Sequence, residues 1–179
     1  ALAGPVTSTV NADGTDTFSY DDNGQLTATD SDYQADENYS YDANGNQADG
    51  GNSWTYLYDR ENRFTGAFQS FMGFVGNTVT NTYDMFGRLT EQRVKWVSVN
   101  YTNRYVYDDQ WRMLAWYYSD PNTSVVIKYV YGPGIDEPVR LNTGANGTNY
   151  YYHAAALDTV TELTDGAGVK VEQYSYDVY

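Results

Sequence analysis

Cysteine is absent from this 179-residue chain, and histidine occurs once, as His153. The absence of cysteine excludes disulfides, thiolate nucleophiles and zinc sites built on cysteine. A catalytic dyad or triad with an imidazole base has at most one candidate. Lysine and arginine together number 10 against 24 acidic residues, a net charge of -14. This balance argues against nucleic acid and against an anionic membrane surface as partners, because both attract clustered basic residues.

Long hydrophobic runs are also missing. No stretch reaches the roughly 18 apolar residues that a membrane-spanning helix needs, so no membrane insertion is expected. Aromatic residues are abundant instead, with 20 Tyr, 6 Phe and 4 Trp beside 16 Gly. Disordered acidic chains are poor in aromatic residues, so this composition favours an ordered all-β protein whose sheet carries aromatic rings. The chain begins at Ala1 rather than Met, which indicates processing or a place within a longer protein.

An internal repeat organises the chain. Its pattern is Tyr-x-Tyr-Asp, then Gly or Asn two to three residues later, then an alternating segment such as Arg-Leu-Thr. The copies, of which 129–132 is degenerate and the last is truncated, occupy residues 18–27, 39–46, 56–64, 82–90, 105–114, 129–132 and 174–179. A repeat of this length predicts one supersecondary unit per copy.

Each copy predicts a strand, a tight turn and a returning strand. Tyr-x-Tyr has the period of two that places both rings on one face of a sheet. Aspartate in the turn accepts hydrogen bonds from nearby backbone N–H groups, and the glycine after it tolerates a left-handed conformation. We therefore expect positive φ at Gly24, Gly45 and Gly87. The Gly87→Val change should destabilise the fold by more than about 1 kcal/mol. The turn aspartates are Asp21, Asp42, Asp59, Asp84, Asp108 and Asp177.

The predicted fold is all-β: a twisted antiparallel sheet of successive β-hairpins, one per repeat, in a solenoid-like architecture. Alternating apolar residues at 94–101 and 125–131 predict strands between the turns. Residues 153–157 are the candidate for a single helical turn. The Gly132-Pro133-Gly134 segment divides the hairpins of residues 1–131 from a terminal block, 132–179, that continues the same sheet within one domain.

The motif is similar to that of a known family. The copy at 83–89, Tyr-Asp-Met-Phe-Gly-Arg-Leu, resembles the YD repeat of bacterial Rhs proteins and animal teneurins. The stretches 129–139, 151–153, 163–171 and 174–177 resemble the end of an Rhs core. In large members such hairpins spiral into a hollow shell that encloses a toxin or seals an adhesion module. The self-cleaving segment and toxin of complete Rhs proteins match no residues here, so the resemblance carries over no catalytic residue.

We interpret the chain as a non-enzymatic structural protein, extracellular or on a bacterial cell surface. Its two edge strands, at 6–10 and 171–176, predict head-to-tail strand addition into a filament or surface layer. The edge residues are Val6, Thr7, Val10, Val171, Tyr174 and Tyr176. Two alternatives stay open. One is a fragment of an Rhs shell that encapsulates a toxin, with the remainder of a longer chain as partner. The other is a carbohydrate-binding or adhesion module.

Two further groups of residues are candidates for ligand binding. Exposed indole rings stack on sugars, although rings in a sheet more often pack across strands. The tryptophans concerned are Trp54, Trp96, Trp111 and Trp116. No cofactor is predicted, with calcium as the alternative because carboxylates in turns suit this ion. The best placed carboxylates for it are Asp13, Asp16, Asp30 and Asp32, which are equally typical of ordinary turns.

Overall fold

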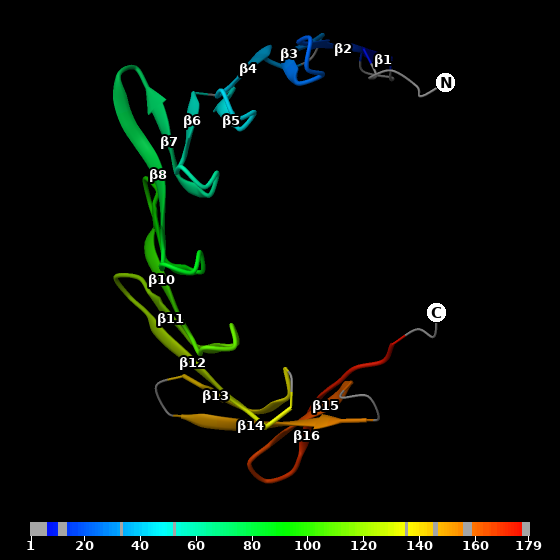
Figure 1. Ribbon diagram of the computed structural model, residues 1–179, viewed down its shortest axis with the longest axis vertical. Helices are drawn as coiled ribbons and strands as arrows, with labels where there is room; N and C mark the ends of the chain where they lie inside the picture. Colours follow the sequence, from blue (N-terminus) through cyan, green and yellow to red (C-terminus); the bar gives the residue numbers. More distant parts are fainter. Residues whose placement is uncertain are drawn as a thin grey trace. The chain divides into compact units, whose positions relative to one another are not determined.

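In the computed structural model the described residues form 16 strands, and the fold is all-β. Figure 1 shows how hairpins follow one another along the chain. The structure describes residues 7–10, 14–32, 34–51, 53–134, 136–144, 147–155 and 159–176. Three of the candidate residues named above, Val6, Asp13 and Asp177, lie outside these ranges. Within them, no helix long and apolar enough to cross a membrane is found.

Each strand neighbours the strands next to it in sequence, so the sheet order runs from β1 to β16, and the pairing is antiparallel. The strands of the first half are β1 (Ser8–Val10), β2 (Thr15–Tyr20), β3 (Leu26–Ser31), β4 (Glu37–Tyr41), β5 (Gln47–Gly50), β6 (Trp54–Tyr58), β7 (Phe64–Phe71) and β8 (Phe74–Tyr83). Those of the second half are β9 (Leu89–Lys95), β10 (Asn100–Tyr107), β11 (Met113–Ser119), β12 (Ser124–Tyr131), β13 (Pro138–Thr143), β14 (Thr148–Ala154), β15 (Val160–Asp165) and β16 (Lys170–Gln173). The predicted antiparallel all-β fold is confirmed.

The chain divides into two compact units, which are described separately below. The first unit comprises Ala1–Asn81 with Lys95–Val97, and the second comprises Thr82–Val94 with Ser98–Tyr179. The sequence predicted a different division, into the blocks 1–131 and 132–179 of one continuous sheet. That division stays a prediction.

In five hairpins the strand register shifts by one residue at the tyrosine that enters the turn. Such shifts occur at Tyr20, Tyr41, Tyr58, Tyr107 and Tyr131. A β-bulge adds one unpaired residue and increases the local twist. The repeat therefore places one bulge at the same point of each of these hairpins.

The apolar core is thin. Among the described residues the buried hydrophobic side chains are Ala67, Val94, Ala115 and Leu163. Half-buried rings pack across strands instead, as in the pairs Tyr101–Tyr118, with centroids 5.6 Å apart, and Tyr58–Phe64, 5.8 Å apart. A sheet without a second layer buries its rings only against their neighbours, so cross-strand contacts carry much of the packing.

Three details of the predicted secondary structure are wrong. The alternating stretch 94–101 is not one strand: β9 ends at Lys95, β10 begins at Asn100, and residues 96–99 connect them. The edge strands are shorter than predicted, because β1 starts at Ser8 and β16 ends at Gln173, before Tyr174 and Tyr176. His153 and Ala154 belong to β14 rather than to a helical turn. By contrast, the strand predicted at 125–131 is confirmed as β12.

Candidate functional site

The Asp-centred turns form the repeated feature of the structure. We call the segments 21–25, 42–46, 59–63, 84–88 and 108–112 the motif turns. In each, Oδ1 of the aspartate accepts hydrogen bonds from the backbone N–H groups two and four residues later. For Asp84 the donors are Phe86 at 2.9 Å and Arg88 at 3.0 Å. The corresponding pairs in the other motif turns measure 2.9–3.0 Å. The aspartate side chain thus replaces backbone partners inside the turn.

The third residue after each aspartate has a left-handed backbone. The expectation of positive φ is met at Gly24 (79°), Gly45 (85°) and Gly87 (84°). Asn62 and Trp111 occupy the same position with φ of 60° and 69°. Asparagine tolerates this region, whereas a bulky side chain is strained there.

An arginine closes three of the motif turns. Nε of Arg63, Arg88 and Arg112 each donates to Oδ2 of its own turn aspartate at 2.7 Å. Burial would raise the pKa of Asp84, but hydrogen bonds from the backbone and side chain of Arg88 outweigh it and hold that pKa below the usual value. In the turn of Asp42 the side-chain amide of Asn46 does the same, and the pKa of Asp42 is lowered.

The residue that closes one turn also reaches the next turn. Within the second unit, Nη1 of Arg88 donates to the carbonyl of Asp108 at 2.5 Å, and Nη1 of Arg112 donates to the carbonyl of Gly132 at 3.3 Å. Within the first unit, Nε2 of Gln25 donates to the carbonyl of Gly45 at 3.2 Å. In these three cases a side chain of one turn is bonded to the backbone of the next turn.

Aromatic rings surround the guanidinium of Arg88. Its Cζ lies 5.3 Å from the ring centroid of Phe86, 5.2 Å from that of Tyr107 and 5.5 Å from that of Trp111. Cζ of Arg112 lies 4.9 Å from the ring of Tyr131. Such cation–π contacts strengthen when the cation is shielded from water.

A second link joins neighbouring hairpins through tyrosine hydroxyls. The second tyrosine of a Tyr-x-Tyr copy donates to a carbonyl at the start of the preceding return strand. The pairs are Tyr41 to Leu26 at 2.8 Å, Tyr107 to Leu89 at 3.0 Å, Tyr131 to Met113 at 3.2 Å and Tyr176 to Val160 at 2.7 Å. Burial, and then the neighbouring tyrosine, raises the pKa of Tyr107 and of Tyr131, so both stay neutral donors.

Sequence reasoning missed three parts of this arrangement. The arginine four residues after Asp59, Asp84 and Asp108 was visible in the motif but was given no role. The turn at Asp165 has the same geometry, since Oδ1 accepts from Ala167 and Val169 at 2.9 Å, and its signal was the Asp-x-x-Gly spacing up to Gly168. In the turn after β12, Glu137 takes the place of the aspartate and accepts from the N–H of Gly134 at 3.0 Å.

The four tryptophans do not share one environment. Trp54 is half-buried in β6, and Trp96 lies in the turn after β9 with 48% exposure. The indole of Trp116 donates to Oδ1 of Asn103 at 2.9 Å, so its ring packs within the sheet. Trp111 lies against Arg88. Sugar stacking on these rings stays a prediction.

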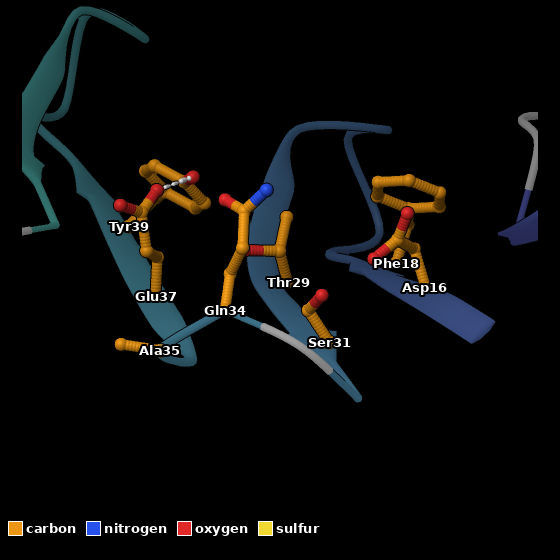
Figure 2. Close-up of a pocket in the computed structure, with 8 residues that line it drawn as sticks. All are labelled: Asp16, Phe18, Thr29, Ser31, Gln34, Ala35, Glu37 and Tyr39. Carbon is orange, nitrogen blue, oxygen red and sulfur yellow. Dashed lines mark hydrogen bonds between the residues drawn. The ribbon is translucent and has the colours of Figure 1, made fainter. Parts of the chain in front are cut away.

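Of the calcium candidates, Asp16 lines a pocket of about 250 Å³ in the first unit. Figure 2 shows Asp16 and Phe18 on β2, and Glu37 and Tyr39 on β4, on either side of β3. The hydroxyl of Tyr39 donates to Glu37, which raises the pKa of Tyr39 (Figure 2). Oδ2 of Asp32 accepts from the N–H of Thr15 at 2.9 Å.

No group of three or more acidic or histidine side chains arranged for a metal ion is found among the described residues. Asp30 lies in β3, in the strand that borders this pocket, and Asp13 is outside the described ranges. Calcium binding stays untested.

The predicted assembly edges are exposed. Val10 is 78% and Val171 is 45% exposed, and the carbonyl of Thr7 accepts from the N–H of Phe18 at 2.9 Å. Tyr174 and Tyr176 follow β16, where the N–H of Tyr174 still donates to the carbonyl of Thr161 at 2.8 Å. These residues lie in or beside β1 and β16, the first and last strands of the sheet order. The described residues include no further strand that pairs with either edge.

Strand, Asp-centred turn and linked return strand together define a sheet of the YD-repeat type. No family model matches the chain. The chain is 32% identical over 144 residues to the tRNA3(Ser)-specific nuclease WapA of Bacillus spizizenii. It is 31% identical over 145 residues to the tRNA nuclease WapA of Bacillus subtilis strain 168. Each alignment covers 80% of this chain but 6% of the relative, so the chain spans a small part of these bacterial proteins.

Solved structures have the same fold. The TcdB2–TccC3 structure without its hypervariable C-terminal region has a TM-score of 0.67 and covers 90% of this chain and 10% of that chain, at 14% identity. The Photorhabdus luminescens Tc holotoxin pore has a TM-score of 0.59 and covers 88% of this chain and 11% of that chain, also at 14% identity. The chain is Rhs-like, with YD-repeat hairpins, as its motifs indicated. That the chain comes from the end of an Rhs core stays a prediction.

The comparisons also correct the functional interpretation. The chain was predicted to be a non-enzymatic structural protein that forms filaments, with adhesion as an alternative. The curated relatives are instead named as tRNA nucleases. The predictions of a non-enzymatic protein, a filament and an adhesion module are therefore wrong.

Proposed function

We propose that this chain is a section of the repeat sheet of a longer bacterial Rhs-type toxin, secreted or on the cell surface, that cleaves tRNA. In this proposal the sheet forms part of a wall around the toxic portion of the same protein. The observation that carries it is the match of 80% of the chain to 6% of relatives named tRNA nucleases. The shell fragment left open as an alternative by the sequence is thus the better interpretation.

The linked turns support the role of a wall. A single sheet has no second layer to stiffen it, so side-chain links between neighbouring hairpins add to the backbone hydrogen bonds that join them. Arg88 and Arg112 connect consecutive turns, and the hydroxyls of Tyr107 and Tyr131 connect the same hairpins from the strand side. These bonds repeat with the sequence motif, as a continuous enclosure requires.

The nuclease activity is tested on the full-length protein that contains this chain. Purified protein is incubated with total bacterial tRNA, and the products are separated on denaturing gels. We expect discrete tRNA cleavage, with duplex DNA of similar length left intact. Intact tRNA after incubation would refute the proposed activity.

The wall is tested separately by limited proteolysis of the same full-length protein. The Arg88→Ala and Arg112→Ala changes together should make the toxic portion several-fold more sensitive to protease, because they release two turn-to-turn links. Arg60→Ala is the control, since Arg60 is an exposed arginine of a motif turn. Equal protease resistance of the wild type, the double variant and Arg60→Ala would refute the proposed role of the sheet as a wall. It would leave the result of the nuclease assay unaffected.

A further inference from the structure

A hollow on one face of the second unit has the chemistry of an anion-binding site. It spans β10 to β14 and has a volume of about 610 Å³. Lys128 and Arg140 line it, and no aspartate or glutamate is among its lining residues. The charge of this hollow is thus opposite in sign to the net charge of the chain, which is -14.

Lys128 and Arg140 lie close together on this face. The register pairs Lys128 of β12 with Asn142 of β13, and Val130 with Arg140. Lys128 and Arg140 are therefore diagonal neighbours, which in an antiparallel pair lie roughly 7–8 Å apart. Both side chains are long enough to reach a single anion placed between them.

Neither cation has a partner within the described ranges. Other basic residues of the second unit are paired: Arg104 with Glu91 at 2.7 Å, and Lys170 with Glu162 at 2.7 Å. Lys128 and Arg140 form no ion pair and no side-chain hydrogen bond among the residues that the structure describes. Nε of Arg140 is also shielded from solvent without an acceptor. A shielded charged donor without an acceptor is costly, so turning the Arg140 guanidinium toward a bound anion would lower the free energy of this site.

Apolar side chains border the two cations. Val106 is 44%, Val130 is 41% and Tyr117 is 38% exposed, and all three line the hollow. The amide of Asn142 is occupied, because its Nδ2 donates to Oδ1 of Asn149 at 3.0 Å. The free chemistry of the hollow is therefore two cations within an apolar border.

We propose that this hollow binds an acidic peptide segment, with a carboxylate between Lys128 and Arg140 and apolar side chains on Val106 and Val130. A peptide matches the site better than RNA does. RNA carries one charge per nucleotide and needs several basic contacts to bind at physiological salt, whereas this hollow offers two in a strongly acidic chain. A peptide supplies the single anion together with side chains that bury the exposed valines.

The test uses the 179-residue chain and the probe peptide acetyl-Leu-Glu-Val-Glu-Leu-amide. Backbone amide NMR shifts follow a titration, with the glutamine version of the peptide as matched ligand. We expect saturable shifts at β12 and β13 that weaken as salt increases, and at least about tenfold weaker binding of the glutamine peptide. Lys128→Gln and Arg140→Gln should each weaken binding of the acidic peptide to a similar extent. Arg93→Gln removes a cation that is paired with Glu91 outside the hollow. This change should leave the affinity for the acidic peptide within about twofold of the wild-type value.

Several results would overturn the proposal. Equal affinity for the glutamine peptide would exclude a carboxylate site. If Arg93→Gln reduces the peptide-induced shifts as much as Lys128→Gln does, the peptide is attracted to the whole face and has no specific site. Tighter binding of a short oligouridylate than of the peptide would assign the hollow to nucleic acid. Lys128 is exposed, so Lys128→Gln provides the test even if Arg140→Gln does not fold.

Discussion

The guanidinium of Arg88 donates a hydrogen bond to the backbone carbonyl of Asp108, the aspartate of the next motif turn. The same guanidinium holds its own aspartate through Nε, so one side chain belongs to two turns. Arg112 repeats the arrangement toward Gly132. The repeat motif thus specifies both a turn and the bond from that turn to the next.

Arg88→Ala should lower the free energy of unfolding by about 1–2 kcal/mol, because it leaves the carbonyl of Asp108 without its side-chain donor. Arg88→Lys should recover only part of this loss, since an ammonium cannot bond both turns with the geometry of a guanidinium. Urea unfolding followed by tryptophan fluorescence measures both. Arg60→Ala, on an exposed arginine, is the matched control and should change little. A lysine variant as stable as the wild type would show that the two-turn geometry contributes nothing.

Tyr105 and Tyr107 form a natural comparison on one strand. The hydroxyl of Tyr107 donates to the carbonyl of Leu89, whereas that of Tyr105 has no hydrogen-bond partner among the described residues. Tyr107→Phe should therefore cost about 1 kcal/mol in thermal or urea unfolding, and Tyr105→Phe should be close to neutral. Equal effects of the two changes would mean that the inter-hairpin hydroxyl bond does not stabilise the sheet.

Much of the fold could be predicted because the repeat encodes its turns locally. Aspartate with glycine three residues later fixes both the acceptor and the left-handed position, and no distant contact is needed. The turn around Gly132 could not be recognised in this way. There the acceptor is Glu137, which comes after the glycines in sequence and reaches back to the N–H of Gly134. That placement depends on the fold and not on spacing.

At residues 94–101 the sequence pattern predicts one long strand where the structure has two. The apolar alternation continues through residues 96–99, which contain no glycine, proline or aspartate to indicate a turn. The chain turns there because β9 and β10 are antiparallel neighbours of limited length. Pairs such as Glu91–Arg104 and the hollow at Lys128 and Arg140 also depend on register across strands, which a single sequence does not reveal.

Acid should destabilise the fold through the motif aspartates. The pKa values of Asp42, Asp59, Asp84 and Asp108 are lowered in the folded chain, whereas in the unfolded chain each titrates near about 3.9. A lowered pKa contributes stability that is present above the unfolded value and is lost as pH falls through the folded value. The free energy of unfolding should therefore decrease from about pH 5 downward.

Repulsion within the acidic chain has the opposite pH dependence, because protonation relieves it. Asp108→Asn separates the two effects: it removes one titrating turn but leaves most of the net charge. Urea unfolding at a series of pH values should give a shallower acid loss for Asp108→Asn than for the wild type. Identical slopes would show that the motif aspartates do not cause the acid loss.

Gly166 and Gly168 allow the backbone requirement of these turns to be measured without a steric clash. Both belong to the turn of Asp165, and a Cβ at either position meets nothing within 4 Å. Only Gly168 has a left-handed backbone, with φ of 81°. Gly168→Ala should cost about 1–2 kcal/mol from the left-handed conformation alone. Gly166→Ala should be neutral or stabilise by up to about 1 kcal/mol, because alanine restricts the unfolded chain.

Because neither change touches a neighbour, the difference between their unfolding midpoints measures the cost of φ itself. The same cost should appear at Gly24, where φ is 79° and the space is also open. If Gly168→Ala and Gly166→Ala unfold at the same urea concentration, the glycine of the repeat is not required for its backbone conformation.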